Sequence, residues 1–261
     1  MLIGAMNHPA RDPVAEIDWI GQNGFDFVDF TLEPPAADPG RIDVDAIRAA
    51  LDRHDLGVIA HTAYYLPLAS PLAGIREGCR HELRQALQAA HRLGAKVMNT
   101  HFDRPPKFFT DRQTVGWQVE VLGPLCDEAA QVGMTIVLEH VPFAGASQLE
   151  MIVAVLENVP RLRFHLDSGH AKLERGHDRW NEYIDRLGHK LLHVHLSEND
   201  GTADQHLPLG SAPRSTTDWP GHIRKLKSSG YDGTITLEVF SPEKEYLLLS
   251  RELLKRWWAE G

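Results

Sequence analysis

The chain has 261 residues, of which 43% are hydrophobic and 24% charged, a balance that supplies a large core and excludes a disordered-type composition. Its formal net charge of −9 excludes a broad basic field, so we expect DNA not to be a partner. No apolar run approaches the length of a membrane span, no secretory leader is recognisable, and the two cysteines form no CxxC motif. We therefore expect a cytoplasmic protein without membrane spans, disulfides or thiolate zinc.

Short apolar runs rich in β-branched residues alternate with amphipathic segments along the whole chain, the pattern typical of βα units and a parallel sheet. The final segment, residues 245–260, predicts a helix that lays Leu249, Leu253 and Trp257 along one buried face. Glycines that indicate helix ends are Gly24, Gly94, Gly133 and Gly230. The predicted strands cover residues 2–7, 25–33, 57–64, 95–102, 134–141, 162–168, 191–197 and 234–240.

Strands that are each followed by a helix, in a chain of this length, predict the α/β class and a single (β/α)8 TIM barrel. No segment has the composition of a linker, so we expect one domain over residues 1–261. Active sites of this fold lie at the C-terminal ends of the strands. The polar residues at those ends therefore matter most.

The predicted strand ends carry residue types that bind metals. Parity along a strand places His165 and His193 deeper than their neighbours, where we interpret them as supporting or core residues. Oxygen and nitrogen ligands without sulfur suit zinc, manganese, magnesium or iron, and so many ligands predict two to three ions rather than one. The candidate ligands are His61, His101, Glu139, Asp167, His195 and Glu238 at strand ends, and His170, Asp204 and His206 in the loops beyond.

The motifs HTAYYLPLAS, NTHF, LEH, LDSGH, HVHLSEND, DQHLPLG and LEV resemble those of the xylose isomerase-like TIM-barrel superfamily over essentially the whole chain. That superfamily includes sugar isomerases and epimerases, and also the endonuclease IV type of apurinic endonuclease. By resemblance to the epimerase branch, His170 would contact the substrate. The same resemblance implies one metal ion held by Glu139, Asp167, His195 and Glu238.

The endonuclease branch keeps these ligands and adds four more, building a cluster of three zinc ions. By that resemblance the first ion would be shared by His61, His101 and Glu139, the second by Glu139, Asp167, His195 and Glu238, and the third by His170, Asp204 and His206. The loop NTHFDRPPKFF lacks the His-Pro-Gly of the endonucleases, and the loops that would grip a duplex are short. DNA repair is therefore not predicted, even with the metal ligands retained.

The leading hypothesis is a metal-dependent hydrolase with an endonuclease IV-like site of two to three zinc, manganese or iron ions, acting on a small phosphorylated, sugar-like substrate. The catalytic candidates are Glu139, Glu238 and His170. Loop cations that could meet a substrate phosphate are Arg104, Lys107, Lys172, Arg175 and Arg214, and Glu33 is a further candidate substrate contact at the end of the second strand.

The alternative hypothesis is a sugar or sugar-phosphate isomerase or epimerase with a single ion. In it, Glu139 and Glu238 pass a proton between them across a bound ketose or aldose. A barrel that only binds a ligand is the third possibility and ranks last, because carboxylates that converge without a cation repel one another.

Overall fold

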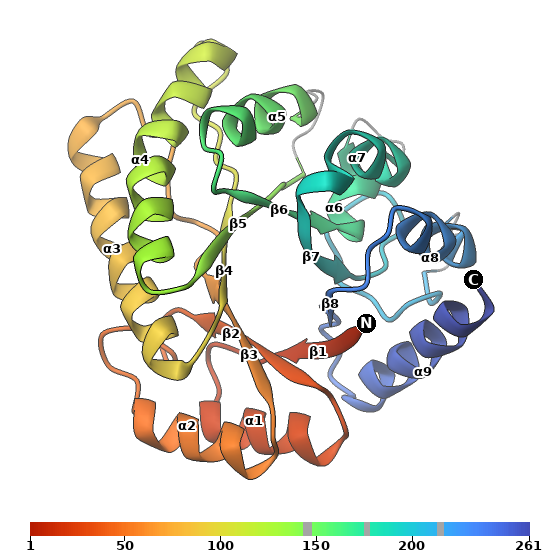
Figure 1. The fold of residues 1–261 in the computed structure, drawn as a ribbon. Coiled ribbons are helices and arrows are strands. Elements are labelled where there is room, and N and C mark those ends of the chain that lie inside the picture. Colours follow the sequence, from red (N-terminus) through yellow and green to blue (C-terminus); the bar gives the residue numbers. More distant parts are fainter. Residues whose placement is uncertain (143–147, 175–177, 213–216) are drawn as a thin grey trace. The chain divides into compact units, whose positions relative to one another are not determined.

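The computed structural model describes residues 1–142, 148–174, 178–212 and 217–261 (Figure 1). Over these residues, eight parallel strands follow one another in chain order around a closed barrel. They are β1 (Leu2–Met6), β2 (Phe27–Leu32), β3 (Gly57–Thr62), β4 (Val97–His101), β5 (Thr135–Glu139), β6 (Arg163–Asp167), β7 (Leu191–Leu196) and β8 (Thr234–Leu237). Each lies within its predicted range, so the predicted TIM barrel is confirmed.

Helices connect the strands, as the alternating pattern predicted. The described helices are α1 (Pro13–Gln22), α2 (Val44–Arg53), α3 (Ala73–Leu93), α4 (Asp111–Gln131), α5 (Leu149–Asn158), α6 (Ser168–Leu173), α7 (Trp180–Leu187), the 3₁₀ helix η2 (Gly188–Lys190), α8 (Trp219–Ser228) and α9 (Glu245–Glu260). In Figure 1, α1 and α2 lie side by side, as do α3 and α4. None of the helices in the described ranges combines the length and hydropathy needed to cross a bilayer.

Local sequence explains where the helices begin and end. Asp43 caps α2 by accepting a hydrogen bond from the backbone of Ala46, and Thr110 and Gln113 form a reciprocal capping box at the start of α4. Gly94 ends α3 in the left-handed conformation, with a φ of 90°, which costs a glycine little. The other glycines predicted to mark helix ends, Gly24, Gly133 and Gly230, also have positive φ.

The described residues form two compact units. The β2–β5 unit comprises Ala5–Glu139 and Glu150–Arg163, and the β6–β8 unit comprises Met1–Gly4, His140–Leu149 and Phe164–Gly261. A single domain over the whole chain stays a prediction. Within each unit the parallel register aligns the polar strand ends: His101 pairs with Glu139, and Asp167 pairs with His195.

Helix α9 buries a different face from the one predicted. Leu247, Ser250 and Leu254 are buried, whereas Leu249 is 53% exposed, so its predicted place in the core is wrong. The sequence misleads at this helix because the buried face includes a polar residue. Ser250 is satisfied in the core, since its hydroxyl donates to the carbonyl of Tyr246 and accepts from the backbone N–H of Leu209. A helix rotated in this way buries positions three and seven residues beyond Leu247.

The two faces of α9 provide a matched test of this core. Because Leu254 is fully buried, we expect Leu254→Ala to lower the free energy of unfolding by about 2–5 kcal/mol. Leu249→Ala removes an exposed side chain and should change it by less than about 0.5 kcal/mol. Urea denaturation of both variants measures the difference. Equal losses would contradict this orientation of α9.

Candidate metal and sugar site

Three polar side chains meet at the ends of β3, β4 and β5 in the β2–β5 unit, and we call His61, His101 and Glu139 the His61 cluster. The Nε2 atoms of His61 and His101 lie 3.1 Å apart, and His101 Nε2 lies 3.0 Å from Glu139 Oε2. All three residues are buried, and they offer ligand atoms within 4.8 Å of one another. The structure thus brings together the three residues that the endonuclease resemblance assigned to the first ion.

Neighbouring polar groups orient this cluster. Asn99, two residues before His101 on β4, donates a 2.6 Å hydrogen bond from Nδ2 to Glu139 Oε2. Asp29, on β2, is fully buried and has a carboxylate oxygen 3.7 Å from His61 Nδ1. A carboxylate beside the second ring nitrogen is the arrangement that typically orients a metal-binding imidazole. Asn99 and Asp29 were not predicted, although each lies on the face that parity would have selected.

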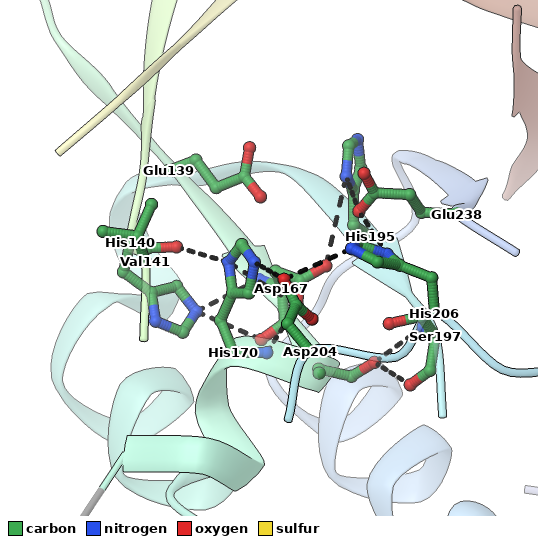
Figure 2. A network of polar contacts seen from close by, with 12 residues as sticks. Glu139, His140, Val141, Asp167, His170, His195, Ser197, Asp204, His206 and Glu238 are labelled. Carbon is green, nitrogen blue, oxygen red and sulfur yellow. Dashed lines mark hydrogen bonds and ion pairs between the residues drawn. The ribbon is translucent and has the colours of Figure 1, made fainter. Parts of the chain in front are cut away.

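The β6–β8 unit holds a second set of convergent ligands, shown in Figure 2, and we call Asp167, His195 and Glu238 the Asp167 cluster. His195 Nδ1 lies 3.0 Å from Glu238 Oε2 and 4.0 Å from Asp167 Oδ2. Asp167 and His195 are fully buried, and Glu238 is 8% exposed. Two buried carboxylates on one imidazole form an electronegative site, which a cation would stabilise.

The loop after β7 returns two more predicted ligands to this cluster. Glu198 and Leu207 pair as an antiparallel bridge, which closes the intervening residues into a compact loop. His206 adopts a φ of 47°, in the left-handed region that residues with side chains rarely occupy. In this conformation its Nδ1 lies 3.6 Å from Glu238 Oε2, and its Nε2 lies 3.2 Å from Asp204 Oδ2. The histidine-rich stretch of the sequence is therefore a strand end followed by a loop that folds back onto it.

Asp204 joins two histidines through one oxygen. Its Oδ2 lies 3.2 Å from both His170 Nε2 and His206 Nε2, so the predicted third-ion set is brought together (Figure 2). Burial raises the pKa of Asp204, but hydrogen bonds and charges from the two histidines outweigh it and hold the pKa well below its usual range. Burial lowers the pKa of His206, but the charges of Glu238, Asp204 and Asp167 raise it to about 9.

His140 supports the cluster and was not predicted. It follows Glu139 directly in the sequence, and it is fully buried. Its carbonyl oxygen accepts a 2.7 Å hydrogen bond from His170 Nδ1, and its Nε2 lies 3.2 Å from the backbone N of Asp167 (Figure 2). Because Nδ1 of His170 donates to His140, its Nε2 faces Asp204 Oδ2: a protonated His170 donates to that carboxylate, whereas a neutral one would present Nε2 as a ligand atom.

The donor sets fit a divalent cation. Each cluster combines imidazole nitrogen with carboxylate oxygen, contains no thiolate, and has ligand atoms within 4.8 Å of one another. Supporting hydrogen bonds fix the orientation of several ligands, as in protein metal sites generally. Carboxylates and imidazoles so arranged could also exchange protons with a bound substrate.

The deeper histidines behave as the strand parity predicted. His165 and His193 are fully buried, and their rings contact each other with centroids 4.7 Å apart. His193 Nδ1 lies 2.8 Å from the hydroxyl of Thr234, and its Nε2 lies 3.2 Å from that of Thr236. The hydroxyl partners on both nitrogens support the interpretation of His193 as a supporting residue, and its ligand atoms also lie within 4.8 Å of those of His165 and His195.

The residues predicted to contact a phosphate differ in burial and in hydrogen-bond partners. Lys172 is buried, and its ammonium group donates to Glu198 at 2.9 Å, to the carbonyl of Asn199 at 2.5 Å and to Thr217 at 2.8 Å. An ammonium has three protons, so none is left for a substrate phosphate, and the interpretation of Lys172 as a substrate residue does not fit its surroundings. Lys107 is exposed.

The remaining predicted substrate contacts lie in loops. Arg104 lies 3.4 Å from Asp111, in an ion pair that water screens. Glu33 is half-buried one residue beyond β2, and burial raises its pKa despite a hydrogen bond with Tyr65 and the charges of two histidines. Arg175 and Arg214 lie outside the described residues.

Comparisons with known proteins identify the family of the chain. The model of the family "xylose isomerase-like TIM barrel" matches residues 17–257, and the chain belongs to that family. An uncharacterised protein of Methanocaldococcus jannaschii is 25% identical over 214 residues, which cover 79% of this chain and 71% of that protein. The fructoselysine 3-epimerase of Escherichia coli O157:H7 is 28% identical over 151 residues, which cover 55% of this chain and 53% of the epimerase.

A solved structure, that of a D-tagatose 3-epimerase-like protein, has the same fold over the whole chain. It superposes with a TM-score of 0.86 at 20% identity and covers 100% of this chain and 98% of the other. The resemblance predicted from the motifs is thereby confirmed at the level of family and fold. The relatives whose names state an activity are the fructoselysine 3-epimerase and the D-tagatose 3-epimerase-like protein.

The charge on His206 gives a pH-dependent prediction. In metal-free protein we expect His206 to titrate near pH 9, and we expect Asp204→Asn to lower its pKa by removing a charge and a hydrogen-bond acceptor. The raised pKa also means that protonated His206 stabilises the fold fully below pH 6.5, an effect lost as pH rises through 9. Histidine NMR titration measures both values. An unchanged His206 pKa in the variant would contradict the assigned cause.

Proposed function

We propose that the protein is a divalent-metal-dependent sugar epimerase that inverts a carbon next to the carbonyl group of a ketose. The observation that carries the proposal is the convergence of Asp167, His195 and Glu238 at the ends of β6, β7 and β8. Membership of the xylose isomerase-like family and the likeness to a fructoselysine 3-epimerase support the choice of reaction.

The proposed metal ligands lie at or within one residue of the C-terminal ends of four successive strands, and they are Glu139, Asp167, His195 and Glu238. A bound divalent cation would supply Lewis acidity that polarises the carbonyl and the neighbouring hydroxyl of the sugar. Side chains of the protein orient the sugar and transfer the proton. The side chains of His195 and Asp167 are held in place by the surrounding residues because both are fully buried. They provide a fixed frame, which orients the sugar relative to the proton-transfer groups.

Glu139 and Glu238 are the proposed acid–base pair. One carboxylate removes the proton from the carbon next to the carbonyl, leaving its electron pair in an enediolate. The other carboxylic acid then delivers a proton to the opposite face of the same carbon, and the configuration is inverted. Asn99 orients Glu139 through its 2.6 Å hydrogen bond, and His195 contacts Glu238 at 3.0 Å. His170 is the proposed contact for a sugar hydroxyl.

A multinuclear phosphoester hydrolase is the second candidate. It is favoured by one observation, that His61, His101 and Glu139 also converge, as do His170, Asp204 and His206. The epimerase needs neither set as metal ligands, although both could bind sugar hydroxyls. The comparisons give the hydrolase no support, and Lys172 is occupied by Glu198. We therefore rank it below the epimerase.

Substitution of the acid–base pair tests the proposed chemistry. We expect Glu139→Gln and Glu238→Gln each to lower kcat for ketose epimerisation by about 100-fold or more, because an amide cannot accept the proton. Glu245→Gln, which changes an exposed carboxylate on α9, should retain activity. Product ratios are measured by chromatography on a panel of ketoses. Full activity in either site variant would contradict the proposed roles.

Metal removal separates the two candidates. The epimerase proposal predicts that chelation abolishes activity, and that about one equivalent of zinc, manganese or iron restores it. Asp167→Asn should weaken that binding, whereas His206→Ala should leave the metal content unchanged. Elemental analysis and titration of the metal-free protein measure both. A requirement for two to three ions, lost together with phosphoester hydrolysis in His206→Ala, would favour the hydrolase.

A further inference from the structure

Two neighbouring tyrosines lie exposed in the turn after β3. Tyr64 is 71% exposed and Tyr65 is 55% exposed, and their rings meet edge to face with centroids 5.3 Å apart. Aromatic side chains gain much from burial, so an adjacent exposed pair typically indicates a ligand-binding surface. Neither residue takes part in the proposed proton transfer.

The pair is continuous with the His61 cluster. Tyr64 lies three residues beyond His61, and its ring centroid is 6.4 Å from that of His101. Tyr65 lies near enough to Glu33 for its hydroxyl to lower the pKa of that carboxyl. The β2–β3 register accounts for this contact: Leu32 pairs with Thr62, which brings the residues beyond both strands to one end of the unit. A substrate held near His101 and larger than one ring would extend over these tyrosines.

The residues of this surface indicate which chemical group, attached to the substrate, would bind there. Exposed aromatic faces lie beside a tyrosine hydroxyl and the Glu33 carboxylate, so apolar contact and hydrogen bonding are offered together. A pyranose ring has both features, with C–H groups on its face and hydroxyls on its rim. A phosphate does not suit the site, because Glu33 would repel it.

We propose that Tyr64, Tyr65 and Glu33 bind a second sugar ring attached to the ketose, so that the preferred substrate is a glycosylated ketose rather than a free one. This inference rests on the proposed epimerase function and adds its substrate class. The aromatic faces stack on the second ring, and Glu33 accepts hydrogen bonds from its hydroxyls. The reacting ketose unit stays with the acid–base pair.

The test compares D-fructose with 6-O-glucosyl-D-fructose, whose fructose unit keeps free hydroxyls beside the carbonyl. We expect kcat/KM to be higher for the disaccharide. The ratio of the two values should fall by about tenfold in Tyr64→Ala and in Tyr65→Ala, mainly through the KM of the disaccharide. Tyr64→Phe keeps the aromatic face and should keep the ratio. Tyr246→Ala, on α9 and also exposed, is the matched control and should change nothing.

Binding of the disaccharide to metal-free protein, measured by calorimetry, is the second readout. Weaker binding in the two alanine variants supports the subsite even if no ketose is epimerised, an outcome that would sink only the proposed reaction. Epimerisation of ketoses without a preference for the disaccharide would overturn the subsite and leave the proposed reaction standing. Equal losses on both sugars in the variants would also overturn it.

Discussion

Buried carboxylates around His195 are the constraint on which the rest of this structure depends. Asp167 and Glu238 both face His195 Nδ1, in surroundings where an isolated charge costs several kcal/mol. Such an arrangement is stable only with positive charge nearby, and the raised pKa of His206 reports the same field. A divalent cation brings two positive charges to these carboxylates, whereas one protonated histidine brings only one. The buried charges therefore support a bound cation independently of the similarity to known epimerases.

Backbone contacts and a folded loop hold these charges in place. His140 contacts the backbone of Asp167, and its carbonyl oxygen accepts a hydrogen bond from His170 Nδ1, so one buried residue orients two residues of the candidate site. The buried pair of Lys172 and Glu198 lies at the base of the loop after β7, where Glu198 also bridges to Leu207. Loss of the hydrogen-bond partners of metal ligands typically lowers metal affinity or activity by about 10- to 100-fold. The strained φ of His206 fits this account, since the loop positions its ring against Glu238.

Much of this arrangement follows from the sequence because strand parity and strand ends are local properties. The eight strands were predicted, and each predicted strand-end residue in the His61 and Asp167 clusters lies where the barrel gathers polar groups. Features that depend on distant partners were not accessible. Lys172 was predicted to contact a phosphate because its actual partner, Glu198, lies 26 residues away in the sequence. The buried face of α9 was missed because it includes a polar residue, Ser250. The choice between epimerase and hydrolase also lay beyond the sequence, because both use the same ligand types.

The measurement that tests the central claim most directly is hydrogen exchange at the substrate carbon. Metal-loaded protein is incubated in D2O with a ketose, and NMR follows deuterium at the carbon next to the carbonyl. Proton transfer through Glu139 and Glu238 predicts deuterium at that carbon in both epimers, with exchange that is lost in Glu238→Gln. Retention of the original hydrogen in every ketose, together with release of phosphate from a sugar phosphate, would contradict the account.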